Sequence, residues 1–455
     1  MLGRLWASAT MLSVSAAGVL ALALAGGCSA KPGATDDRLC TPGANVYCRC
    51  ANRDEGTKLC NEDGKSFQAC QPCPDDPPGT SSGGPTTQPD GGSSPPDDGG
   101  FVPVDSGPLP DVVGGPPIDD KCIGKLGVLA GSDKDSVTFA AVYKGGGAFD
   151  VESSTGPGMQ SNAQILPVGT SLLAVWVGKL SSLVSAKYTS AWSAPTSFQS
   201  TGSIPSLTAM GTQAKVVYLG LDGAYYVGTY NAGWDTADTS AEPSGGITIP
   251  GKSAPSLAAV GSTLVYAFTG SDDSLNQVSS SGTTFGAPKS LGSAYSAPPA
   301  LTLMNGGSKD LLTVFTGDDL ALHSVTRLAS NKTWATSQLI DDTAQTNDTP
   351  SVAALPGGGA IAVWRAVSGQ AYFSVYDPAK TSPWSAPAEL VSGNNPTVTS
   401  TPVLAQGKCG ADVVAAYSEA SGAVSVMHYA NGKWTAPYPI GGMTNLTYVG
   451  VGELP

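Results

Sequence analysis

The feature that most constrains the fold of this chain is a repeat, an apolar run ending in an aromatic residue that recurs seven times. The steps between successive aromatic endings are 33, 42, 50, 47, 49 and 53 residues. Self-similarity at this period indicates that one small structural unit is copied along the chain. The aromatic endings are Tyr143, Trp176, Tyr218, Phe268, Phe315, Trp364 and Tyr417.

Two further series keep the same period. A second aromatic residue follows each of the last six endings by 16 to 20 residues, and a proline followed by small residues precedes each of the last five. The second aromatic residues are Trp192, Trp234, Phe285, Trp334, Trp384 and Trp434. The prolines are Pro205, Pro255, Pro299, Pro350 and Pro402. Each unit therefore contains a short small-residue run, an apolar run, a tyrosine-bearing run and an aromatic residue that leads into a fourth run.

These runs have the length of β-strands and are separated by Gly, Asn, Asp and Ser turns, whereas no stretch shows sustained helical periodicity. Four strands in about 48 residues, repeated around a ring, predict an all-β fold. We expect a seven-bladed β-propeller of four-stranded blades over residues 122–455, with the small-residue runs as innermost strands that carry no carboxylate. The first repeat is short, so six blades plus an irregular first repeat is the alternative.

Two distant cysteines support a closed ring. Cys122 precedes the first repeat and Cys409 lies in the inner turn of the seventh. A ring makes these positions neighbours, whereas a linear array would separate them. We therefore expect a Cys122–Cys409 disulfide that locks the closure.

The N-terminus indicates export. Residues 1–27 carry Arg4 as their only charge and a long apolar run, followed directly by Ala25-Gly26-Gly27-Cys28, which predicts a secretory signal rather than a membrane span. The string Leu24 to Cys28 resembles the bacterial lipobox, although Ala25 stands where that family favours Leu. The resemblance implies acylation of Cys28 and a lipid anchor, with residues 28–39 as a tether. Ser29 is compatible with the outer membrane, where we expect the protein; ordinary signal-peptidase cleavage is the alternative.

Six cysteines cluster within residues 40–73: Cys40, Cys48, Cys50, Cys60, Cys70 and Cys73. So short a segment cannot build a sufficient apolar core, and in an oxidising compartment it predicts a module with three disulfides of undetermined connectivity. Zinc or redox roles lack support, because no histidine is near and no βαβ pattern surrounds the cysteines. The segment resembles a small cysteine module of exported Gram-negative lipoproteins, a likeness that implies no activity.

Residues 74–121 are rich in Pro, Gly, Ser and Asp. Up to residue 120 this segment contains nine aspartates and no Lys or Arg. Such a segment is expected to be a disordered, extended linker. It accounts for most of the formal charge of −13, and 21 acidic against 15 basic residues follow it from Cys122 onward. Without a basic face, binding of nucleic acid is disfavoured.

The propeller units share a degenerate pattern: Pro-Ser-Leu-x-Ala, an aromatic-x-Gly, Asp-Gly, Tyr, and then Trp-Ser-Ala-Pro at 192–195 and 384–387. This pattern resembles bacterial and fungal propeller lectins and the related sialidase-like propellers. The resemblance implies a lectin-like, non-catalytic recognition protein that binds carbohydrate. A propeller scaffold for a protein partner in the cell envelope is the alternative reading.

An enzyme is the least favoured class. The propeller region contains only Arg327 and Arg365, so the arginine triad of sialidases cannot be assembled. The two histidines, His323 and His428, have no recognisable catalytic partner. A polysaccharide hydrolase or lyase is kept as a third hypothesis.

Two sets of residues are candidates for ligand binding. Trp192, Trp234, Trp334, Trp384 and Trp434 either pack between blades or stack on sugars in pockets between adjacent blades. Asp222, Asp272 and Asp318 lie in turns between the second and third strands. These aspartates serve turn geometry or form a rim that binds Ca²⁺ or sugar hydroxyls. Tyr225, Tyr226, Tyr372 and Phe373 are secondary candidates, and no other metal or cofactor is expected.

Overall fold

The chain divides into two compact units, Met1–Gly100 and Phe101–Pro455. The computed structural model describes residues 45–49, 55–59, 61–63, 65–68, 118–132, 134, 136–235, 239–240, 253–281, 284–295, 297–304, 309–391 and 395–455. In the first unit, β1 (Asn45–Arg49) and β2 (Glu55–Leu59) form an antiparallel hairpin. The signal, the acylation of Cys28, the pairing of the six clustered cysteines and the linker up to residue 117 lie outside the described residues.

The second unit consists of seven antiparallel sheets, which confirms the predicted all-β propeller of seven four-stranded blades. Blade 1 is β32 (Tyr448–Glu453), β3 (Leu126–Gly131), β4 (Val137–Gly145) and β5 (Ala148–Thr155). Blade 2 is β6 (Gln164–Val168), β7 (Ser171–Gly178), β8 (Ser182–Tyr188) and β9 (Thr196–Ser200). Blade 3 is β10 (Ser206–Met210), β11 (Gln213–Leu219), β12 (Tyr225–Tyr230) and β13 (Thr239–Ser240).

The remaining blades follow the same order from the innermost strand outward. Blade 4 is β14 (Ser256–Val260), β15 (Thr263–Thr269), β16 (Ser274–Ser281) and β18 (Lys289–Ser293), with the short β17 (Thr284–Phe285). Blade 5 is β19 (Ala300–Leu303), β20 (Leu311–Thr316), β21 (Ala321–Arg327) and β22 (Gln338–Gln345). Blade 6 is β23 (Ser351–Ala354), β24 (Ala360–Arg365), β25 (Ala371–Tyr376) and β26 (Ala388–Glu389). Blade 7 is β27 (Val403–Gln406), β28 (Val413–Ser418), β29 (Val424–Ala430) and β31 (Tyr438–Pro439), with the short β30 (Lys433–Trp434).

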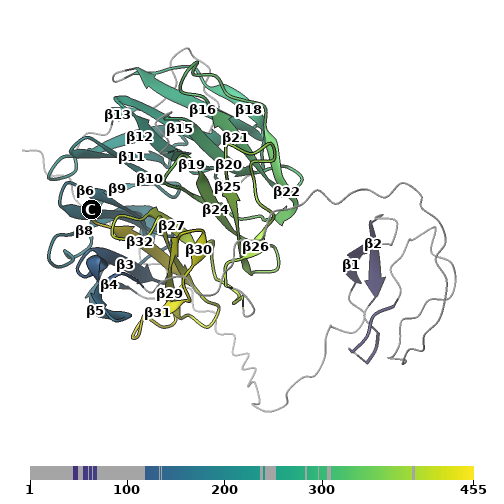
Figure 1. Ribbon diagram of the computed structural model, residues 1–455, viewed down its shortest axis with the longest axis horizontal. Coiled ribbons are helices and arrows are strands. Elements are labelled where there is room, and N and C mark those ends of the chain that lie inside the picture. The colour runs from purple at the N-terminus through teal and green to yellow at the C-terminus, as the bar shows by residue number, and fades with distance from the viewer. Residues whose placement is uncertain are drawn as a thin grey trace, which may run out of the picture. The chain divides into compact units, whose positions relative to one another are not determined.

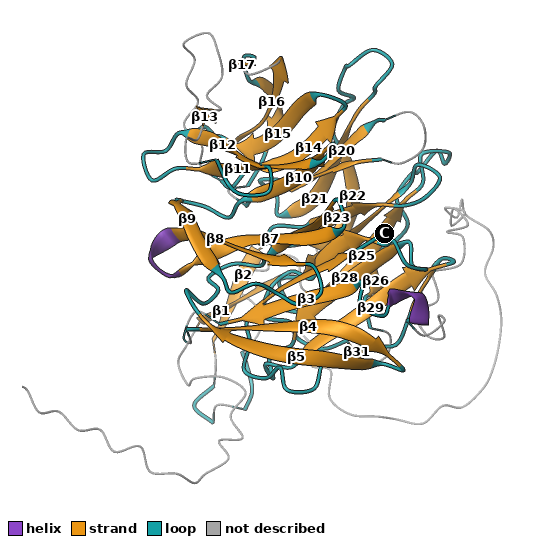
Figure 2. Ribbon diagram, turned by 90° about the vertical axis from the view of Figure 1, so that its left-hand side faces the viewer, coloured by secondary structure: helices purple, strands orange, loops and turns teal. Residues whose placement is uncertain are grey.

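Helical structure is confined, in the described part of the chain, to two 3₁₀ turns, η1 (Asp120–Cys122) and η2 (Lys179–Ser181) (Figure 2). None of the described helices is long and apolar enough to span a bilayer.

The innermost strands form a closed ring in which each contacts the next, in the order β6, β10, β14, β19, β23, β27, β32 and back to β6 (Figure 1). Serines of the Pro-Ser motif connect neighbouring strands of this ring. The Oγ atoms of Ser206, Ser256 and Ser351 accept hydrogen bonds from the N–H groups of Leu257, Leu301 and Leu404 on the next blade. The motif therefore couples adjacent blades at the centre of the propeller.

The first and last segments of the propeller together build blade 1. Strand β32, at the C-terminus, pairs with β3 from Leu126↔Glu453 to Gly131↔Tyr448 and takes the innermost place. This corrects the sequence interpretation of the first repeat. Tyr143 lies on the third strand of its blade, β4, whereas the six later aromatic endings lie on second strands.

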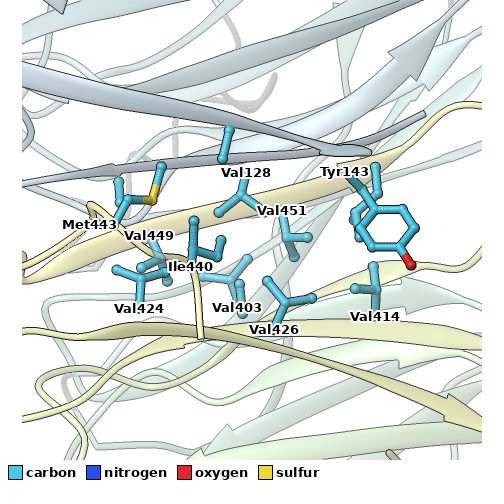
Figure 3. Close-up of a cluster of buried hydrophobic side chains, with 14 of the residues drawn as sticks. Val128, Tyr143, Val403, Val414, Val424, Val426, Ile440, Met443, Val449 and Val451 are labelled. Carbon is cyan, nitrogen blue, oxygen red and sulfur yellow. The ribbon is translucent and has the colours of Figure 1, made fainter. Parts of the chain in front are cut away.

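The junction between blades 7 and 1 is covalently and hydrophobically closed. The predicted Cys122–Cys409 disulfide is present, with a Cα–Cα distance of 5.1 Å across 287 residues of sequence. Beside it, Val128 and Val451 of blade 1 pack in one buried cluster with Val414 and Val426 of blade 7, which we call the valine cluster (Figure 3). Ile118, from the segment expected to be linker, is buried in the same cluster. Burial of each such side chain contributes about 1.5–3 kcal/mol to folding.

Candidate functional site

The antiparallel order of the strands gives each blade two ends. At one, the connection end, lie the turns between second and third strands and the segments that lead to the next blade; at the other, the hairpin end, lie the turns after the first and third strands. The candidate aspartates lie at the connection end and the candidate tryptophans at the hairpin end. The structure therefore separates the two predicted sets into different surfaces.

The exposed carboxylates at the connection end serve their own turns. Asp222 accepts hydrogen bonds from the Tyr226 hydroxyl at 2.6 Å and the Ala224 N–H at 3.1 Å, and the bond from Tyr226 is the main cause that lowers its pKa. Asp272 accepts from the Ser274 hydroxyl at 2.5 Å, which likewise lowers the pKa of Asp272.

In the next blade the neighbour of Asp318 has the same turn role. Asp319 accepts from the Ala321 N–H at 3.0 Å and lies 3.2 Å from Nε2 of His323. In the part of the chain that the structure describes, no three potential metal ligands converge at these turns. The local geometry is therefore that of turns, and the rim that binds Ca²⁺ or sugar hydroxyls stays a prediction.

Four of the five candidate tryptophans reach from the hairpin end onto the third strand of the preceding blade. The Nε1–H groups of Trp234, Trp334 and Trp384 donate to Ser185, Gln277 and Ser324 at 2.9, 3.0 and 2.9 Å. The fully buried ring of Trp434 lies 6.0 Å, centroid to centroid, from that of Phe373. These rings hold neighbouring blades together.

Trp192, the fifth candidate, lies at the junction of blades 1 and 2. It packs in the same apolar cluster as Ala140 and Val142 of β4, where the junctions of Trp234, Trp334 and Trp384 offer Ser or Gln. No described residue accepts a hydrogen bond from its Nε1–H. Its half-buried ring lines two adjoining cavities of about 240 and 230 Å³, both of which also contain Ala140 and Glu152. We call these two cavities together the Trp192 groove.

Polar groups accompany the ring in the Trp192 groove. One cavity is also lined by Tyr188 and by the Lys144–Asp150 ion pair. The ring of Tyr188 lies 5.5 Å from that of Trp192, and its hydroxyl donates to the carbonyl of Gly124 at 3.0 Å. Burial, assisted by the charge of Glu152, raises the pKa of Tyr188. The groove thus combines aromatic surface with carboxylates.

The four secondary candidates, which are on third strands, lie away from this groove. Tyr225 and Phe373 are buried and Tyr226 and Tyr372 are partly buried. Tyr225 packs against Tyr266 and Phe268 of blade 4, and Tyr372 stacks on Trp364 of its own blade. Their main contacts are therefore within the protein.

A buried polar pair lies at the ring closure and corrects one expectation. Glu453 on the innermost strand β32 is 1% exposed, so the expectation that innermost strands carry no carboxylate is wrong. Its Oε1 lies 3.1 Å from Nε2 of His428, which is 3% exposed. The other carboxylate oxygen, Oε2, accepts from the N–H groups of Lys408 and Cys409 at 2.7 and 3.2 Å.

This closure pair has surroundings that suit a structural role. The sulfur atoms of Cys122 and Cys409 lie within 4.8 Å of the Glu453 carboxylate, but in the disulfide they do not act as thiolate ligands. His428 also lines a cavity of about 600 Å³ with Tyr143 and Tyr438. Sequence reasoning missed Glu453 because β32 carries no Pro-Ser motif.

A third hollow lies around the propeller axis at the connection end. Two adjoining cavities of about 150 and 350 Å³ share Gln164, Ile204, Thr349, Pro350 and Ser351. We call them together the axial depression. Among the described residues that line it, the one carboxylate, Asp348, is paired with Arg365 at 2.9 Å.

Known proteins are similar to this chain in fold. No family model matches the sequence, and no curated protein does. A lectin from Burkholderia pseudomallei is 15% identical, with a TM-score of 0.50 over 70% of this chain and 99% of that one. The Aleuria aurantia lectin in complex with Fucα1-6GlcNAc is 14% identical, with a TM-score of 0.44 over 62% and 97%. A leech intramolecular trans-sialidase is 10% identical, with a TM-score of 0.42 over 57% and 64%. At these identities, the first likeness supports the propeller fold alone.

Proposed function

We propose that this propeller is a lectin-like recognition protein that binds carbohydrate without transforming it, and that the Trp192 groove holds a sugar. The observation that carries the proposal is the difference between Trp192 and its repeats. At other junctions the tryptophan bonds to a polar side chain of the preceding blade or is fully buried, whereas Trp192 does neither and lines open space.

The chemistry of the groove suits a sugar. An aromatic ring packs on the C–H face of a pyranose, and carboxylates such as Glu152 accept hydrogen bonds from its hydroxyl groups. Pockets with mostly apolar walls and a few polar groups are typical of small-ligand sites. We do not extend the proposal to the fucose named for a structural neighbour, because that likeness carries no argument about the ligand of this chain.

A glycan array with the purified full chain, followed by calorimetric titration of the best glycan, tests this function. We expect Trp192→Ala to weaken binding at least tenfold, because it removes the aromatic wall. Trp234→Ala is the matched control, since that ring has the same place in its repeat but bonds to Ser185. An array without any bound glycan, or equal affinities for Trp192→Ala and the wild type, would contradict the proposal. In the first case, a protein partner in the envelope becomes the favoured ligand class.

We also propose that the protein is exported and held on the bacterial outer membrane by acylation of Cys28. The string before Cys28 supports this proposal. Metabolic labelling with a palmitate analogue tests it: we expect label on the wild type and none on Cys28→Ala. An unlabelled wild-type protein would refute the anchor and leave the carbohydrate proposal untouched.

A further inference from the structure

The axial depression is built from segments of the ring that are distant in sequence. Its walls come from the starts of the innermost strands and from the loops that precede them, including Asn162 before β6, Thr349 before β23 and Thr401 before β27. Its larger cavity, about 350 Å³, lies within the usual size of small-ligand sites, roughly 300–1,000 Å³. All five prolines of the repeated series, Pro205, Pro255, Pro299, Pro350 and Pro402, line the depression, so the repeat marks part of this surface.

Amide and hydroxyl side chains predominate in the larger cavity of the depression, whereas proline, alanine and leucine line most of the smaller one. The carboxylate of Asp348 is neutralised by Arg365. The guanidinium of Arg365 is fixed further by a hydrogen bond from its Nε to the carbonyl of Val398 at 2.9 Å. Among the described residues of these walls, a ligand with a net charge would find no free counter-charge, so their chemistry favours a neutral molecule with many hydroxyl groups.

One wall is preorganised by hydrogen bonds within the protein. The amide of Asn162 donates to the carbonyl of Thr401 at 3.1 Å and accepts from the N–H of Val449 at 3.0 Å. These bonds join the loop before blade 2 to blade 7 and to the C-terminal strand β32. A rigid wall costs a ligand less ordering entropy on binding.

Other groups on the walls are unpaired. The hydroxyl of Thr401 is buried, with the residue only 8% exposed, and no described residue hydrogen bonds to it. The side chains of Gln164 and Thr349 also make no hydrogen bond with the described residues. The Oγ of Thr401 itself exposes less than 1 Å², so this side chain must turn toward the cavity before a ligand can bond to it. A buried hydroxyl without a partner costs about 1–3 kcal/mol, which a ligand that supplies the partner then recovers.

Apolar groups border the depression. Ile204 is 38% exposed and lines both cavities, and the partly buried ring of Tyr448 lines the larger one. Polar walls beside an aromatic ring match the two aspects of a pyranose, whose hydroxyls point outward while its C–H groups form an apolar face. A small polyol without a ring would leave this apolar surface unused.

We propose that the axial depression binds a neutral sugar, as a second site separate from the Trp192 groove. The inference rests on the proposed carbohydrate function and deepens it, because it names an uncharged pyranose as the ligand class. Since the depression opens at the connection end and Trp192 lies at the hairpin end, the two sites take separate ligands. The unpaired hydroxyl of Thr401 is the group that we expect to bond to a sugar hydroxyl.

The test is calorimetric titration of the full chain with D-galactose, D-mannose, L-fucose and N-acetyl-D-glucosamine, with D-glucuronate as the anionic probe. We expect saturable binding of at least one neutral sugar and weaker binding of glucuronate. Thr401→Val removes the hydroxyl at nearly constant volume and is expected to weaken binding of that sugar at least tenfold. The matched control is Thr313→Val, which removes a buried, unpaired hydroxyl outside the depression and should leave binding unchanged.

Comparison with Trp192→Ala separates the two sites. The axial site is supported if Thr401→Val weakens a binding event that Trp192→Ala leaves intact. It is overturned if Thr401→Val binds every sugar as the wild type does, or if glucuronate binds best. If Trp192→Ala then abolishes all binding, the proposed function stands and the axial site alone falls. If the wild type binds neither these sugars nor any arrayed glycan, both proposals fall.

Discussion

The junction between blades 7 and 1 is built differently from the regular junctions, such as that between blades 5 and 6. At the regular junction, Trp384 packs onto the preceding blade and donates to Ser324, both within the repeated pattern. At the closure, the corresponding turn of blade 1 is Gly145-Gly146-Gly147, and the blades are joined by the valine cluster, the Cys122–Cys409 disulfide and the His428–Glu453 pair. Regular junctions thus share a contact between an aromatic residue and the preceding blade, whereas the closure uses residues from both ends of the propeller.

The largest effect that separates the two kinds of junction is expected from the disulfide. The double variant Cys122→Ser/Cys409→Ser should lower the free energy of unfolding by roughly 5 kcal/mol, because the bridge constrains a very long loop in the unfolded chain. Urea unfolding followed by tryptophan fluorescence measures the change. A loss below about 1 kcal/mol would mean that the valine cluster and β32 close the ring unaided.

At a regular junction, the largest loss is expected from Trp434, whose buried ring packs between Tyr429 and Phe373. Trp434→Ala should cost about 3–5 kcal/mol through the lost contacts and the cavity left behind. Trp234→Ala, at the same place in its repeat but half-buried, should cost about half as much. Equal losses in urea unfolding would show that burial does not set the strength of these junctions.

Much of the regular part could be predicted from the sequence, because it depends on local signals. Aromatic endings, Pro-Ser starts and Gly or Asp turns recur, so they predict strands and their order within a blade. The position of β32 could not be predicted, because its sequence, Tyr448 to Glu453, lacks the Pro-Ser signal and its partner β3 is over 300 residues away. Because β32 was not predicted, Tyr143 was assigned to the second strand instead of the third, and Glu453 was not recognised as an innermost-strand carboxylate.

The candidate sites show the same limit. The sequence indicated five equivalent tryptophans, and Trp192 differs from the others only through what the preceding blade places against it, Ala140 rather than a residue such as Ser185. That difference becomes visible once the strand register is known. The axial depression joins loops from most of the ring. The Pro-Ser motif marks part of its wall, but Asn162, Asp348 and Tyr448 lie outside that motif.

The buried pair at the closure should have the next largest effect. Glu453→Gln keeps an oxygen for the N–H groups of Lys408 and Cys409 but removes the charge that faces His428. We expect a loss of about 1–3 kcal/mol in the free energy of unfolding, since a buried polar group that loses its partner keeps its full desolvation cost. Asp342→Asn, at an exposed carboxylate, is the control and should change stability by less than about 0.5 kcal/mol. Equal behaviour of the two variants would assign the closure to the disulfide and the valine cluster.

The smallest expected effect is a loss of stability at alkaline pH, and it arises at the regular junction between blades 6 and 7. Burial, assisted by the charge of Asp412, raises the pKa of Tyr429 to about 12, from 10.0 for an ordinary tyrosine. The folded protein therefore keeps this proton more tightly than the unfolded chain. Its contribution to stability is complete below about pH 10 and is lost as the pH rises towards about 12.

Tyr429→Phe removes this titration, so the variant should lose less stability than the wild type between pH 10 and pH 12, by about 1–2 kcal/mol. Urea unfolding at a series of alkaline pH values measures the difference, with Tyr295→Phe, on an exposed ring, as the control. Parallel curves for wild type and Tyr429→Phe would place the alkaline loss elsewhere. Tyr429 packs on Trp434 and lies outside the valine cluster. If the stability curves of the wild type and Tyr429→Phe converge at high pH, deprotonation of Tyr429 destabilises a regular junction independently of the closure that the disulfide locks.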